Sequence, residues 1–140
     1  MIHQATIYVT TTDQQRLSNM IALARDHNDR GNLHYIGKLE NELKYADVVA
    51  PEEIPPDVVT MRSRVKLKDL DTGEEKVYSI VFPSESNFDD GKISILAPLA
   101  TALLGCRRGN IVEVDAPAGL RRLLISEILY QPESSGDYDL

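Results

Sequence analysis

The sequence predicts an α+β protein, with a short helical hairpin followed by a twisted antiparallel sheet that packs one short helix on one face. Apolar residues recur at helical spacing up to about residue 46 and alternate with polar residues beyond residue 60. Three prolines within residues 51–56 separate these halves, because proline cannot continue a helix. We therefore divide the chain into a hairpin (1–50), a proline-rich linker (51–57), a sheet domain (58–132) and a loose acidic tail (133–140).

The helical hairpin is predicted from a capping pattern and two apolar stripes. Thr12 and Gln15 have the spacing of a capping box, which marks a helix start. A polar, glycine-containing stretch over residues 26–32 predicts the turn. The two stripes indicate helices of about fourteen residues each, which would pair as a short antiparallel coiled coil of about 21 Å. Their residues are Leu17, Met20, Ile21 and Ala24, then Leu33, Ile36, Leu39, Leu43 and Ala46.

The second half of the chain predicts strands and one helix. Alternation over 61–68 and 76–82 around the turn Asp71-Thr72-Gly73 indicates a β-hairpin. A short strand follows at residues 93–96. A helix is expected over residues 98–104, because proline suits a first helical residue and Gly105 a helix stop. Two further strands, over 111–115 and 120–130, complete the sheet.

A stripe of basic side chains follows one face of the first predicted strand, at Arg62, Arg64, Lys66 and Lys68. One interpretation is a docking face for an acidic partner. The other, which we favour, is a solvated face whose charge is neutralised across the hairpin by Glu74 and Glu75.

Composition and motifs argue against several functions. The net charge of −7 disfavours direct binding to nucleic acid, and no apolar run is long enough to span a membrane. The start of the chain lacks a signal-peptide pattern, so we expect a cytoplasmic protein. The lone Cys106 stands beside Arg107 and Arg108, which would lower the pKa of its thiol, but no histidine follows to act as a base. We expect no catalytic residue, no metal and no cofactor, and hence no enzyme.

The turn between the helices carries Asp26, His27 and Asp29. A pair of carboxylates at this tip is consistent with presenting a divalent cation together with a partner's ligands. The alternative, which we favour, is an ordinary polar turn, since aspartate and asparagine are common there.

Ordered motifs in the second half resemble the C-terminal domain of the Gre transcript-cleavage factors. They span about residues 58–130 and include residues 71–75, 91–95, 98–105 and 116–119. Two further stretches, residues 50–61 and 130–138, are similar to the regulator of nucleoside diphosphate kinase, a Gre-related bacterial family. With them the resemblance covers nearly the whole chain.

The resemblance implies an FKBP-like domain that binds the rim of the RNA polymerase secondary channel, and an N-terminal finger. In Gre factors the rim is met by the loop that matches Leu96, Ala97, Pro98, Leu99 and Thr101 here, and acids at the finger's tip help to hold a catalytic magnesium. This sequence departs from the family at Leu96 and Ala97, where a polar residue and a serine are usual. Ala97 removes a side-chain cap that is worth ~1 kcal/mol.

The predicted hairpin is also shorter than the finger of Gre factors, which must traverse the channel to support transcript cleavage. We therefore expect a monomeric transcription regulator that competes with Gre-type factors without stimulating transcript cleavage. Two alternatives stay open at this point. One is a peptidyl-prolyl isomerase, from the FKBP-like fold, and the other is direct binding to nucleoside diphosphate kinase.

Overall fold

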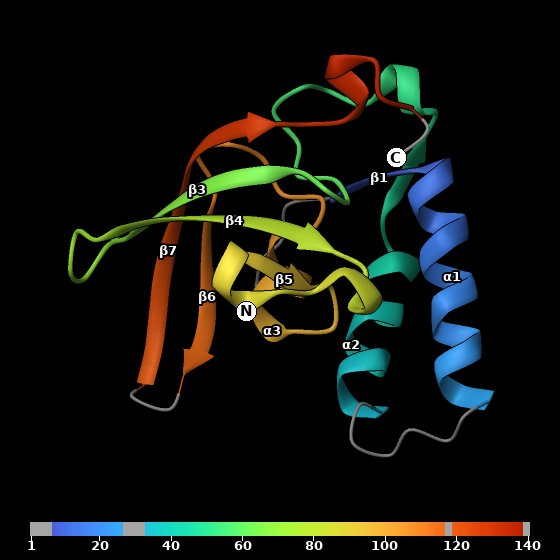
Figure 1. Ribbon diagram of the computed structural model, residues 1–140, viewed down its shortest axis with the longest axis horizontal. Helices are drawn as coiled ribbons and strands as arrows, with labels where there is room; N and C mark the ends of the chain where they lie inside the picture. Colours follow the sequence, from blue (N-terminus) through green and yellow to red (C-terminus); the bar gives the residue numbers. More distant parts are fainter. Residues whose placement is uncertain (1–6, 27–32, 117–118, 139–140) are drawn as a thin grey trace.

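The computed structural model describes residues 7–26, 33–116 and 119–138. Its N-terminal part is a pair of helices, α1 (Thr11–Asp26) and α2 (Leu33–Lys44), which lie side by side (Figure 1). At the base of this hairpin, β1 (Tyr8–Thr10) pairs in parallel with β2 (Asp47–Val49). The hairpin agrees with the sequence prediction, whereas the β1–β2 pair was not predicted.

Helix α1 begins earlier than the capping pattern indicated. The Thr10 hydroxyl accepts a hydrogen bond from the Asp13 N–H at 3.0 Å, so Thr10 is the residue that caps the helix. Gln15, the other member of the predicted capping box, instead donates its side-chain amide to Asn19 at 3.1 Å. The prediction of Thr12 as the cap was wrong by two residues, because Thr10, Thr11 and Thr12 are equally good caps by composition.

The C-terminal part is a five-stranded, curled sheet with the strand order β5-β4-β3-β7-β6. Strands β3 and β4 are antiparallel, and β7 pairs antiparallel with both β3 and β6. The prediction of a wholly antiparallel sheet was wrong at one edge, where β5 runs parallel to β4. Two 3-10 turns, η3 and η4, carry the chain back before β5 begins. The elements are β3 (Arg64–Asp69), β4 (Glu75–Val81), η3 (Pro83–Glu85), η4 (Phe88–Asp90), β5 (Lys92–Ser94), α3 (Pro98–Leu103), β6 (Ile111–Ala116) and β7 (Gly119–Tyr130).

Strand β3 confirms the predicted alternation but starts later than expected. Val65 and Leu67 are buried, while Arg64 and Lys68 point outward. Arg62 lies before the strand in a turn and has a φ of 65°, which is unusual for a residue with a side chain. It is therefore not part of the basic stripe.

One core joins the hairpin to the sheet. Leu17, Ile36 and Leu39 from the helices belong to the same buried cluster as Leu67 and Ile125 from the sheet. Helix α3 packs against β6, and its Leu103 is fully buried in this cluster. The finger is thus held on the sheet domain by apolar packing.

The linker and the tail are both anchored. Pro51–Glu53 form the 3-10 turn η2, and the buried Gln131 donates its side-chain amide to the carbonyls of Pro55 and Val58 at 2.8 Å each. The Tyr130 hydroxyl donates to Asp137, which ties the acidic segment back to the end of β7. Residues 133–138 therefore differ from the expected loose tail.

No helix within the described ranges is long and apolar enough to span a membrane.

Candidate functional site

The loop between β5 and α3 is fixed by side chains at its two ends. The Ser94 hydroxyl accepts the Leu96 N–H at 3.1 Å, and the Ser94 carbonyl accepts the Ala97 N–H at 2.9 Å. At the other end, the Thr101 hydroxyl donates to the Ile95 carbonyl at 2.6 Å. These bonds hold the five sequence-predicted docking residues in one rigid turn.

Within this turn, Pro98 is exposed, and Leu96 and Leu99 are half-buried against the core. Helix α3 begins at Pro98, and Ala97 makes no side-chain cap there, as its sequence predicts. Leu99 also reaches a cavity of about 230 Å³ on the inner face of the sheet. The cavity has one aromatic side chain, and its lining is Leu67, Asp69, Glu74, Lys76, Tyr78, Leu99, Val114, Arg121 and Leu123.

The finger's tip is only partly within the described residues. Asp26 is the last residue of α1 and is exposed, while His27 and Asp29 lie outside the described ranges. Near the tip, Arg25 of α1 donates two hydrogen bonds to Glu40 of α2, at 3.0 and 2.7 Å. Among the described residues there is no cluster of three or more histidine, cysteine or acidic side chains that could hold a metal.

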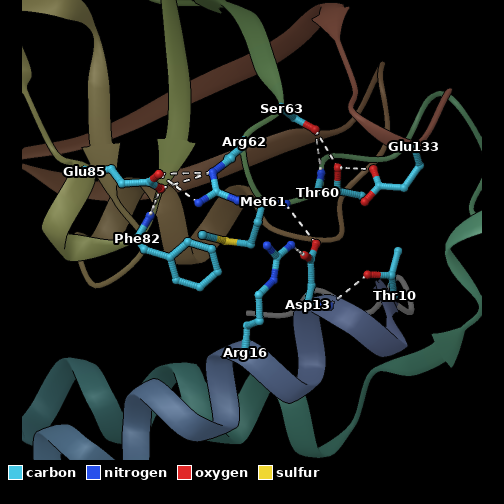
Figure 2. Close-up of polar contacts among 10 residues, drawn as sticks. All are labelled: Thr10, Asp13, Arg16, Thr60, Met61, Arg62, Ser63, Phe82, Glu85 and Glu133. Atoms are coloured by element: carbon cyan, nitrogen blue, oxygen red, sulfur yellow. Dashed lines mark hydrogen bonds and ion pairs between the residues drawn. The ribbon is translucent and has the colours of Figure 1, made fainter. Parts of the chain in front are cut away.

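A buried polar junction joins α1 to the sheet domain (Figure 2). Asp13 is fully buried in the first turn of α1. Its carboxylate accepts the Met61 N–H at 3.1 Å and the Arg16 guanidinium at 2.8 Å. Burial raises the pKa of Asp13, although the bonds from Arg16 and Met61 oppose that shift. The junction therefore ties the finger to the turn that precedes β3.

Phe82 and two arginines extend this junction. The guanidinium carbons of Arg16 and Arg62 each lie 5.3 Å from the centre of the Phe82 ring, which is a cation–π distance. Arg62 also donates to both carboxylate oxygens of Glu85, and this pairing lowers the pKa of Glu85. The unusual φ of Arg62 thus aims its side chain at the junction and away from the sheet face.

A second link ties the same turn to the C-terminal segment. The Thr60 hydroxyl donates to Glu133 at 2.8 Å, and the Thr60 N–H donates to the Ser63 hydroxyl at 2.8 Å. Burial raises the pKa of Glu133. Residues 60–63 therefore contact the finger on one side and the C-terminal segment on the other (Figure 2).

Sequence reasoning missed this junction. Asp13 and Arg16 have ordinary helical spacing, and Met61 is 48 positions away from Asp13. The one available signal was an acid and a base three residues apart in a first helical turn, which is common on exposed helices as well.

Cys106 is not an activated thiol. Its side chain donates to the Ala102 carbonyl at 3.2 Å, and burial raises its pKa to about 11. The suggestion that Arg107 and Arg108 lower this pKa was wrong. Arg107 instead bonds Asp57, at 3.1 and 3.2 Å.

Acidic side chains lie close to part of the basic stripe, but only one of the two acids that the favoured interpretation named is opposite it. Lys68 lies opposite Glu75 in the β3–β4 register, and Lys66 lies 3.7 Å from Glu127 on β7. Glu74, the other predicted partner, lies just before β4 and pairs with Lys76 on that strand at 3.3 Å.

Two family models match the chain. The model described as "Transcription elongation factor, GreA/GreB, C-term" matches residues 54–130. The model described as "Rnk N-terminus" matches residues 6–49. The boundary between the two matches falls in the proline-rich linker.

Full-length relatives give the same result. The chain is 36% identical to the "Regulator of nucleoside diphosphate kinase" of Escherichia coli (strain K12) over 134 residues, which is 95% of this chain and 96% of that protein. It is 35% identical to the "Transcription elongation factor GreA" of Bartonella henselae over 132 residues, with 84% of each chain covered.

Solved structures of similar proteins share the fold. The structure titled "Prokaryotic transcription elongation factor GreA/GreB from Nitrosomonas europaea" has 37% sequence identity and a TM-score of 0.74, and the match covers 89% of this chain and all of that one. The "Structure of the transcription factor Gfh1" matches with 23% identity and a TM-score of 0.52, a likeness of fold alone.

Proposed function

Since the chain belongs to the family of the Gre transcription elongation factors and the regulators of nucleoside diphosphate kinase, we propose that it is a transcription regulator that binds RNA polymerase beside the secondary channel. It would act in the cytoplasm as a monomer, without direct contact to nucleic acid. The support is the family match over the loop Leu96–Thr101, together with the exposure of Pro98 on that rigid loop.

The short finger is the observation that carries the finer proposal. Helix α1 has 16 residues and α2 has 12, so at about 1.5 Å per residue the longer helix of the finger extends about 24 Å. A carboxylate supports metal catalysis only when it lies within coordination distance of the ion, about 2 Å for magnesium. We infer that Asp26 and Asp29 stop short of the polymerase active site, so the protein occupies the Gre site without stimulating cleavage.

The alternatives have less support. The cavity beside Leu99 has Tyr78 as its single aromatic wall, whereas a prolyl isomerase would need a deep aromatic pocket. Direct binding to nucleoside diphosphate kinase is suggested by the name of the E. coli relative, and no described surface points to it. Titrating the two purified proteins against each other would decide that point.

We expect the purified protein to inhibit Gre-stimulated cleavage of stalled transcripts in a reconstituted polymerase assay, because both factors would compete for one site. The inhibition should be relieved by excess Gre factor. By itself the protein should leave the cleavage rate at the level of polymerase alone, and any acceleration of cleavage would contradict the proposal.

Leu99→Asp is expected to weaken binding to polymerase by at least about tenfold, because it places a charge in a small apolar contact. Since Leu99 also packs on the core, Pro98→Glu serves as a second variant whose side chain is exposed. The matched control is Leu70→Asp, at an exposed leucine just beyond the end of β3. Binding measured by co-elution and titration should fall for the first two variants only, and equal losses in all three would remove the loop from the interface.

A further inference from the structure

Strand β6 forms one free edge of the sheet. The order β5-β4-β3-β7-β6 leaves it paired on one side, with β7, as Figure 1 shows. The pairing is regular from Ile111 opposite Leu124 to Ala116 opposite Gly119, whereas the β3–β7 pairing contains register shifts. An edge strand of this kind presents a row of backbone donors and acceptors to solvent.

The outward backbone groups can be assigned from the hydrogen bonds at the start of the strand. The Ile125 N–H donates to the Asn110 carbonyl at 2.9 Å. In an antiparallel pair these bonds alternate, so the backbone groups of Val112 and Val114 face β7. Those of Ile111, Glu113 and Asp115 face outward, and within the described residues no hydrogen bond engages them.

This edge lacks most of the usual protection. Edge strands are commonly blunted by lysine, proline or a bulge, and residues 111–116 contain none of these. The strand instead carries two acids, Glu113 and Asp115, both exposed and both on the outer face of the sheet. Val112 and Val114, which alternate with these acids, point to the inner face, where Val112 is buried.

These acids oppose pairing of β6 with β6 of a second copy. In such a dimer the two β6 strands would run antiparallel about a two-fold axis, with the outer faces of both sheets on the same side. The registers that pair most of the strand place Glu113 of one copy opposite either Glu113 or Asp115 of the other. Like charges directly opposite one another on two strands destabilise the pair. The same two acids would favour an added strand that places basic side chains opposite Glu113 and Asp115.

We propose that the edge of β6 binds an extended protein segment in which basic side chains alternate with apolar ones. The segment adds to the sheet as a sixth strand, bonded to the backbone of Ile111, Glu113 and Asp115. Its basic side chains lie beside Glu113 and Asp115, and its apolar side chains continue the inner row of Val112 and Val114. This site is separate from the loop at α3, so it does not depend on the proposed binding to polymerase.

The test uses the full-length protein labelled with ¹⁵N and three short synthetic peptides. In the first peptide lysine and valine alternate, and in the second glutamate replaces lysine. The third is the lysine peptide with methyl groups on the backbone nitrogens that would otherwise donate hydrogen bonds to β6. The lysine peptide is expected to shift the amide signals of β6 and to slow hydrogen exchange at Ile111, Glu113 and Asp115 by about tenfold or more. The other two peptides are expected to bind at least about fivefold more weakly at low salt.

Charge reversal in the protein supplies the matched comparison. Asp115→Lys should shift the preference toward the glutamate peptide, and the change is at an exposed position opposite Leu120 that leaves the core intact. The control is Glu75→Lys, an exposed acid on β4 at the other side of the sheet, which should leave the preference unchanged. Equal binding of the lysine and glutamate peptides, signal shifts away from β6, unchanged binding by the N-methylated peptide, or no binding at about millimolar peptide would each overturn the proposal.

Discussion

Replacing Asp13 by alanine is expected to lower the free energy of unfolding by about 3 kcal/mol, the range found when one partner of a buried charge pair is removed. The substitution leaves the Met61 N–H without its acceptor and deprives Arg16 of its carboxylate. It also removes the link that fixes α1 to the turn before β3. Urea denaturation at neutral pH, followed by circular dichroism, measures the loss.

Two further variants separate the causes. Asp13→Asn keeps an oxygen acceptor and should be less destabilising than Asp13→Ala. Its free energy of unfolding should fall by about 1 kcal/mol relative to the wild-type protein, since a neutral hydrogen bond replaces a charge-assisted one. Asp26→Ala removes an exposed acid from the other end of the same helix and should change stability by less than about 0.5 kcal/mol. If Asp13→Ala and Asp26→Ala behaved alike, the buried junction would add nothing to the apolar packing that holds the finger.

The pH dependence of this effect has a defined sign. The folded state raises the pKa of Asp13, so the folded protein takes up its proton at a higher pH than the unfolded chain does. The contribution of Asp13 to stability therefore increases as the pH falls from above the raised pKa toward the ordinary value. The stability difference between the wild-type protein and Asp13→Asn should widen over that interval.

Gly105→Ala is expected to destabilise the fold by about 3 kcal/mol. Gly105 has a φ of 80°, and residues with a side chain lose about 1–2 kcal/mol in that region. An added Cβ would also lie 2.6 Å from the Ile7 Cβ and 3.1 Å from the Tyr8 carbonyl oxygen, a clash of the kind that costs a further 1–3 kcal/mol, roughly as in overpacked cores. Thermal and urea unfolding of the purified variant measure this loss.

Gly109→Ala provides the matched control for that prediction. Gly109 also has a positive φ, of 94°, but a Cβ added there would meet nothing within 4 Å. Its substitution should therefore show the backbone effect alone, about 1 kcal/mol. Equal losses at the two glycines would mean that Ile7 and β1 yield to the added methyl group, and that the close packing of β1 on Gly105 contributes little.

Local sequence patterns were sufficient to predict most of the helices and strands. The apolar stripes placed α1 and α2, and the alternation around Asp71-Thr72-Gly73 placed β3 and β4. Pro98 and Gly105 bounded α3 to within one residue of its observed end. These features depend on residues that are near one another along the chain, so a single sequence is enough to reveal them. The family resemblance, too, rests on short ordered motifs, and the family models confirm it.

Features that depend on distant residues were predicted poorly. The parallel β1–β2 pair and the parallel β5 edge bring together segments whose own patterns are short and ambiguous. Arg62 had the spacing of the basic stripe, yet the turn before β3 directs it to Glu85 and Phe82. Arg62 lies before β3, so the alternation of the strand does not place its side chain, and tertiary packing sets where the strand starts.

The sequence by itself determined the helical and extended segments, the family, and the loop that carries the candidate interface. Only the tertiary structure decided how the finger is attached, since Asp13 meets Met61 across 48 positions of chain. It also decided which strand stays open, because the free edge of β6 follows from the strand order and not from the residues of β6. The physical reason is the same in both cases: periodicity reports which face of an element is apolar, whereas contacts between elements depend on how those faces pack together.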